Sequence, residues 1–132
     1  MARYDILVVV NVAKAQRENS LNGNLWMVDT NRNNMSQNEG SSELVTACSP
    51  GDKLVWTVTP IDADLNVSIT NFRGTAVTSG IVTPRQDSDD WSSHVNGVTH
   101  SNWHGLGQYT MTLSVNGTSL TFDPFIDSSP AQ

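Results

Sequence analysis

The chain has 132 residues, which is enough for one domain with a buried core, and we expect a single domain over residues 1–132. Thirteen acidic and seven basic residues give a net charge of −6, and the basic residues are scattered along the sequence. Because nucleic acid and anionic membranes bind to clustered positive charge, this composition argues against both partners.

The first predicted strand covers residues 4–12. Apolar side chains fall on both of its faces, with Ile6 and Val8 on one and Leu7 and Val9 on the other, which favours a central strand covered on both sides. The continuous apolar run is too short for a signal peptide or a membrane span, so we expect the protein in the cytoplasm.

Polar sequence follows, in which only residues 13–17 could form a helical turn. Residues 25–28 predict a second short strand, and Trp26 is assigned to the core. Residues 31–42 are rich in asparagine, glycine and serine and predict a loop.

Residues 44–48 and 53–59 predict two strands joined as a hairpin by a turn with proline and glycine. The second strand contains Trp56, which we also place in the core. Cys48, the one cysteine, cannot form an internal disulfide and is expected to be a buried thiol. Residues 65–70 predict another half-buried strand, and residues 75–82 one or two edge segments that end before Pro84.

The clearest local structure is a hairpin within residues 108–126. Apolar and hydroxyl side chains alternate on both sides of Asn116 and Gly117, which tolerate the positive φ angles of a two-residue turn. This turn would place Val115 opposite Thr118 and bring the apolar residues of both arms onto one face. The other face would carry a row of hydroxyl groups, a candidate contact surface between subunits: Thr110, Thr112, Ser114, Ser119 and Thr121.

Together these patterns predict an all-β fold, an antiparallel β-sandwich of the jelly-roll or immunoglobulin-like kind with seven to nine strands. Parallel architectures are disfavoured because the crossover helices that usually join parallel strands are missing.

Residues 85–107 break the strand rhythm and contain all three histidines, three aspartates and two of the four tryptophans. One hypothesis is a metal site. His100 and His104 are four residues apart, and carboxylates suited to calcium lie upstream at Asp87, Asp89 and Asp90. The glycine and distal glutamate of an EF-hand loop are missing, and a solvated acidic turn explains the carboxylates equally well.

A second hypothesis for this segment is carbohydrate binding. Tryptophan faces can stack on sugar rings while polar side chains bind the hydroxyls, although tryptophan in a β-sandwich more often packs in the core. The candidate ligand-binding residues are Trp91, Trp103, His94, Asn96, His100, Asn102 and His104. Hydrolysis is a third possibility, but no catalytic motif is present. We therefore expect no enzyme, no catalytic residues and, apart from possible calcium, no cofactor.

Three stretches of the sequence carry a family resemblance: YDILVVVNV at residues 4–12, GDKLVWTV at residues 51–58, and QYTMTLSVNGTSLTFDPFI at residues 108–126. In these the chain resembles the PixA/AidA family of bacterial inclusion-body proteins. The resemblance implies a β-sandwich that accumulates in the bacterial cytoplasm, sometimes as crystalline inclusions. It implies no catalytic residues and transfers no site to this sequence.

Two function classes remain. The first is a non-enzymatic, self-assembling protein of the inclusion-body type that forms homo-oligomers, for which the sparsely charged surface and exposed strand edges argue. The alternative is a lectin-like module that binds carbohydrate through residues 85–107.

Overall fold

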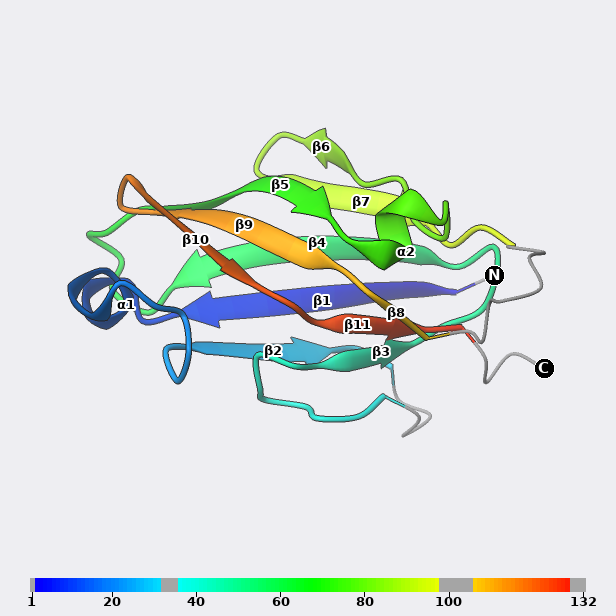
Figure 1. Ribbon diagram of the computed structural model, residues 1–132, viewed down its shortest axis with the longest axis horizontal. Coiled ribbons are helices and arrows are strands. Elements are labelled where there is room, and N and C mark those ends of the chain that lie inside the picture. The colour runs from blue at the N-terminus through cyan, green and yellow to red at the C-terminus, as the bar shows by residue number, and fades with distance from the viewer. Residues whose placement is uncertain (1, 32–35, 98–105, 129–132) are drawn as a thin grey trace.

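The computed structural model describes residues 2–31, 36–97 and 106–128, which form eleven strands and two short helices (Figure 1). The helices are α1 (Val12–Glu18) and α2 (Thr75–Thr78). The strands are β1 (Arg3–Val10), β2 (Leu25–Asp29), β3 (Val45–Ala47), β4 (Lys53–Pro60), β5 (Val67–Arg73), β6 (Arg85–Asp87), β7 (Asp90–His94), β8 (Leu106–Gln108), β9 (Thr110–Val115), β10 (Thr118–Phe122) and β11 (Phe125–Asp127). In this part of the chain, no helix is long and apolar enough to cross a membrane.

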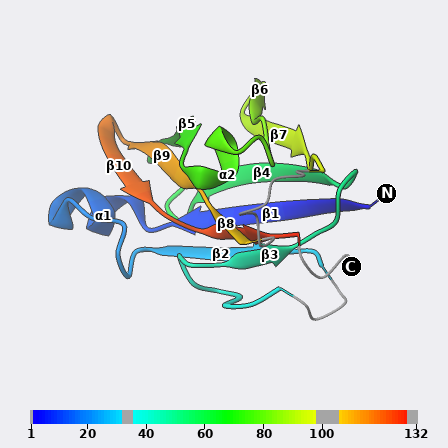
Figure 2. The ribbon, with the colours of Figure 1, turned by 45° about the vertical axis from the view of Figure 1, so that its right-hand side comes forward.

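The largest sheet has five strands in the order β2-β1-β4-β7-β6. A three-stranded sheet, β10-β9-β5, lies over one face of it (Figure 2). A second three-stranded sheet, β3-β11-β8, continues the covering layer. The all-β, sandwich-like architecture expected from the sequence is confirmed, but the described residues form eleven strands instead of the expected seven to nine.

Two strand pairs are parallel, contrary to the expected antiparallel order. β1 pairs with β4 along its whole length, and β11 pairs with β3. A parallel pair needs a long crossover, but the crossover need not be a single helix. Here the chain between β1 and β4 passes through α1, β2 and β3, so the argument from missing helices was wrong.

The predicted hairpin is confirmed in every pair. Val115 lies opposite Thr118, Leu113 opposite Leu120 and Met111 opposite Phe122. Both turn residues have positive φ, 49° at Asn116 and 93° at Gly117, as a two-residue hairpin turn requires.

The expected hairpin between residues 44–48 and 53–59 is wrong. β3 and β4 belong to different sheets, because the turn between them passes from one layer to the other. The buried Asp52 side chain holds this turn: its carboxylate accepts hydrogen bonds from the backbone N–H groups of Ser49 and Ala2, both at 2.8 Å.

Two further segments differ from expectation. Residues 75–78 form the helical turn α2 instead of an edge strand, and the buried Ala76 faces the core. The segment that seemed to break the strand rhythm contributes β6 and β7, whose ladder is built from backbone groups without an apolar alternation. The helical turn considered at residues 13–17 is present within α1.

The core between the two layers centres on four aromatic rings. Trp56 of β4 is fully buried, as predicted. The centroid of its ring lies 4.8 Å from that of Phe72 and 5.8 Å from that of Tyr109. Its indole Nε1 donates a hydrogen bond to the Tyr109 hydroxyl at 3.0 Å. Trp91 completes the group, with its ring 5.2 Å from that of Phe72.

Candidate functional site

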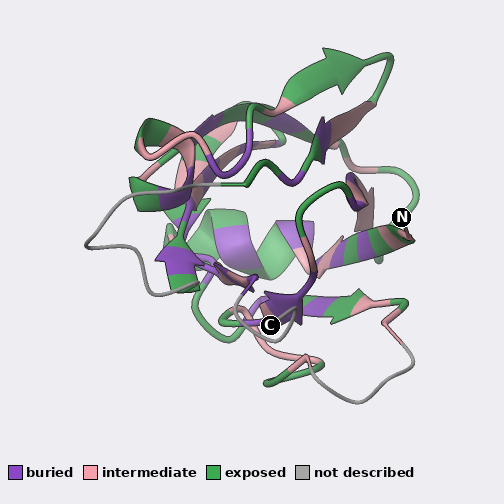
Figure 3. Cartoon of the chain, turned by 90° about the vertical axis from the view of Figure 1, so that its right-hand side faces the viewer, coloured by how far each residue is buried: buried purple, intermediate pink, exposed green. Residues whose placement is uncertain are grey.

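The face of the five-stranded sheet that points away from the other layer, here called the outer face, carries the side chains with most scope for binding. Alternate residues of β1 and β2 point inward to the core and outward to this face, and Figure 3 shows the alternation as bands of buried and exposed residues. The described residues include no helix or sheet packed over it, so the expectation that the first strand is covered on both sides is wrong.

One end of the outer face is apolar. Leu7 and Val9 of β1 lie opposite Val28 and Trp26 of β2, and we call these four residues the apolar patch. Trp26 is 40% exposed and Val28 is 42% exposed, so the placement of Trp26 in the core is wrong. A contiguous exposed apolar surface of this kind marks an interaction site more often than scattered single residues do.

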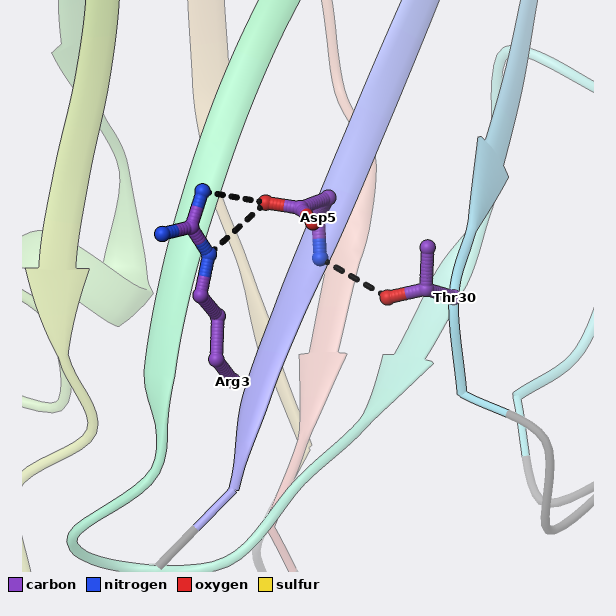
Figure 4. Close-up of polar contacts among 3 residues, drawn as sticks. All are labelled: Arg3, Asp5 and Thr30. Atoms are coloured by element: carbon purple, nitrogen blue, oxygen red, sulfur yellow. Dashed lines mark hydrogen bonds and ion pairs between the residues drawn. The ribbon is translucent and has the colours of Figure 1, made fainter.

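The other end of the outer face is basic. The register aligns Arg3 of β1, Lys53 of β4 and His94 of β7 across the sheet, and Arg85 of β6 lies opposite Ser92. Arg3 is already paired: its guanidinium lies 3.0 Å from the Asp5 carboxylate, and the Asp5 backbone N–H donates to Thr30 (Figure 4).

Lys53, Arg85 and His94 line a hollow of about 420 Å³, which we call the basic hollow. Its remaining lining residues are polar: Thr83, Ser92, Ser93 and Asn96. Two of the predicted ligand-binding residues, His94 and Asn96, are therefore close together. The Asn96 side-chain amide donates to the Gly80 carbonyl oxygen at 2.9 Å, which fixes its orientation.

The structure gives Trp91 a packing role. Besides its ring contact with Phe72, its indole Nε1 donates to the Ile69 carbonyl oxygen at 3.1 Å, which ties β7 to the opposite sheet. The remaining candidates for sugar binding, His100, Asn102, Trp103 and His104, lie outside the described residues. A carbohydrate site would therefore depend on Trp103.

The predicted calcium ligands lie at the β6–β7 turn. Asp87 pairs with Asp90 in the ladder, and Ser88 takes a positive φ of 60° to make the turn. Within residues 2–31, 36–97 and 106–128, no three His, Cys, Asp or Glu side chains are grouped so that they could hold a metal ion. The geometry gives the calcium hypothesis for Asp87, Asp89 and Asp90 no support.

Cys48 is buried, as expected. Burial raises the pKa of its thiol to about 12, and the carboxylates of Asp52, Asp127 and Asp29 add to the rise. The thiolate is the nucleophilic form, so this environment is opposite to that of a reactive cysteine.

We therefore expect folded protein at pH 8 to react with a chromogenic disulfide reagent far more slowly than protein unfolded in guanidinium. Because the folded pKa lies above the value of 9.0 for an unperturbed cysteine, the unfolded chain loses its proton first. The free energy of unfolding that protonated Cys48 contributes is therefore lost as the pH rises from about 9 towards the folded pKa. Rapid reaction of folded protein would contradict the assignment, and Cys48→Ala is the blank that shows no reaction.

Sequence reasoning missed the principal residues of this face. Lys53 and Arg85 are far apart in the chain, and only the pairing of β4, β7 and β6 brings them together. The signal for the apolar patch was present, since β1 and β2 have apolar residues on both faces, but a strand pattern does not show whether a second layer covers it.

Residues 2–121 match a family described as a domain of unknown function, DUF8788. No curated protein matches the sequence. Among solved structures, the fold is similar to that of an inclusion body protein, PixA, from Burkholderia cenocepacia J2315, with a TM-score of 0.74 over 97% of this chain and 95% of that chain. Sequence identity is 15%, so the similarity is one of fold. The structural relationship to PixA expected from the sequence is confirmed at this level.

Proposed function

Since this chain belongs to the DUF8788 family, whose function is unknown, we propose from its own structure that it is a non-enzymatic protein that assembles with copies of itself. The apolar patch carries the proposal. Leu7, Trp26 and Val28 are 36%, 40% and 42% exposed and lie side by side on the outer face. Water is displaced from such a surface when a second apolar surface covers it.

A second copy of the chain is the occupant that we propose for this patch. The same patch on two molecules can pack face to face about a two-fold axis, the commonest arrangement in homo-oligomers. The fold similarity to an inclusion body protein supports an inclusion-type role, with accumulation in the bacterial cytoplasm as the proposed location.

The outer face of the three-stranded sheet is the less favourable contact surface. Its hydroxyl row pairs Ser114 with Ser119 and Thr112 with Thr121, as the sequence predicted. One of its members already has a partner, since the Thr110 hydroxyl donates to the Asp123 carboxylate at 2.7 Å. Hydroxyl groups that water solvates well gain little from burial, so the apolar patch supplies the stronger driving force.

Light scattering coupled to size exclusion, over a range of protein concentrations, tests this proposal. We expect oligomers of the unmodified protein, and a Trp26→Ser/Val28→Ser variant whose self-association is weaker by at least about tenfold, because each substitution removes exposed apolar area from the contact.

Leu106→Ser is the matched control. Leu106 is 51% exposed but belongs to β8 in another sheet, so its replacement should leave self-association unchanged. A protein that remains monomeric at the highest concentrations would overturn the proposal. Equal weakening by Leu106→Ser would show that the contact lies elsewhere.

A further inference from the structure

We propose that the basic hollow is a binding site for the phosphate group of a small phosphorylated molecule. This inference does not depend on self-assembly. It begins from charge: the chain carries thirteen acidic residues against seven basic ones, yet two of the seven, Lys53 and Arg85, line one hollow together with His94.

No carboxylate from the described residues lines this hollow. Among the same residues, no ion pair involves Lys53, Arg85 or His94, and Arg3–Asp5 is the pair found at this end of the sheet. The nearest acidic positions in the ladder are Asp87 and Asp90. Each lies two residues along its strand, from Arg85 and from Ser92 respectively. Lys53 and Arg85 thus line the hollow without an ion-pair partner among the residues that the structure describes.

The arrangement of the strands creates this concentration of charge. Lys53 and His94 are directly opposite in the β4–β7 ladder, and the Cβ atoms of such a pair lie about 5 Å apart. Arg85 reaches the same hollow from β6, beyond Ser92. Lys53 and Arg85 thus place two positive charges at one hollow, and a bound anion would be attracted to both.

The types of donor match a phosphate group. The Arg85 guanidinium can donate two parallel hydrogen bonds to phosphate oxygens, and Lys53 supplies a compact charge. The Ser92 hydroxyl can add a neutral hydrogen bond. The hollow, about 420 Å³, has the size of a small-molecule site and exceeds a free phosphate ion, so we infer that the phosphate belongs to a larger small molecule.

A hollow of similar size lies elsewhere and lacks this chemistry. It has about 390 Å³ and lies between the loop before β2 and strand β10, where Glu43 and Asp123 line it and no basic residue of the described chain does. The contrast assigns anion binding to the basic hollow alone.

Backbone-amide NMR of the full chain, titrated with inorganic phosphate and separately with glycerol 3-phosphate, tests the proposal. Ionic strength must be held constant, because salt screens exposed charges. We expect saturable shifts around residues 85 and 92–96, with a dissociation constant on the order of 1 mM. Glycerol 3-phosphate should bind at least as tightly as phosphate, and acetate should bind more weakly than either.

Arg85→Gln and Lys53→Gln should each weaken binding by about tenfold, the usual effect of removing one charged hydrogen-bond donor. Arg73→Gln on β5 is the matched control and should change nothing, since Arg73 lies on the other sheet. Thermal unfolding of each variant shows that it is folded.

Absence of saturable shifts in the unmodified protein would overturn the proposal. So would equal binding of acetate and phosphate, or equal weakening by Arg73→Gln, since each would indicate general charge attraction. Oligomeric state is measured separately, so failure here and failure of self-assembly are distinguishable.

Discussion

Trp56→Ala is expected to destabilise the protein by about 3–5 kcal/mol, the usual cost of removing a large aromatic side chain from a core. Trp56 is fully buried between the layers, where its ring contacts those of Phe72 and Tyr109. The substitution would leave a cavity at the centre of the aromatic group. It would also remove the hydrogen bond to the buried Tyr109 hydroxyl. Chemical denaturation followed by circular dichroism measures the loss.

Trp26→Ala makes the same change of residue on the outer face. Because Trp26 is 40% exposed and outside the core, its replacement should cost less than about 1 kcal/mol in the free energy of unfolding of the monomer. Equal losses from the two substitutions would contradict the division of the sheet into a buried and an open face.

Gly74→Ala is expected to cost about 3 kcal/mol or more, since two effects combine. Gly74 has φ 104° and ψ −177°, a conformation essentially restricted to glycine. An added Cβ would also lie 3.0 Å from the Gln108 carbonyl oxygen and 3.0 Å from the Tyr109 Cα. These are backbone atoms where β8 joins β9, so neither can move without shifting the strands.

Gly117→Ala isolates the first effect, the strain of a positive φ. Gly117 also has a positive φ, 93°, but an added Cβ there would meet nothing within 4 Å. We expect it to cost about 1 kcal/mol, from backbone strain alone. Thermal or chemical unfolding of both variants tests the comparison, and a Gly117→Ala loss as large as that of Gly74→Ala would rule out the close approach as a cause.

Structure that is specified by residues close together in the sequence could be predicted. The β9–β10 hairpin is specified by its alternation and by Asn116-Gly117, and its register followed from these residues alone. A helical turn was considered at residues 13–17, and the structure extends it to α1, whose first turn Asn11 caps.

Pairing between distant segments was not predictable in the same way. Nothing in β1 or β4 separately specifies that they run parallel, because each would fit an antiparallel partner equally well. β6 and β7 have little apolar alternation, and their ladder rests on backbone hydrogen bonds that any sequence can form. Their apparent irregularity was read as a loop for that reason.

The candidate site shows the same division. Composition placed His94 and Asn96 in a region of interest, and both line the basic hollow. Lys53 and Arg85 could be recognised as neighbours only from the pairing of β4 and β6 with β7. Trp91 was singled out by residue type, but its neighbours across the sandwich give it a packing role.

The parallel pairing of β1 with β4, and of β3 with β11, also bears on how the chain folds. β1 cannot pair with β4 until α1, β2 and β3 have been looped out, and β3 must wait for β11, the last strand of the described residues. Closing such loops costs conformational entropy before the stabilising contacts form, so we expect folding to be slow for a chain of this size. During synthesis, β3 would emerge from the ribosome well before its partner β11. An unfolded chain with exposed strands is prone to aggregate, so the long wait of β3 for its partner raises the risk of aggregation during folding.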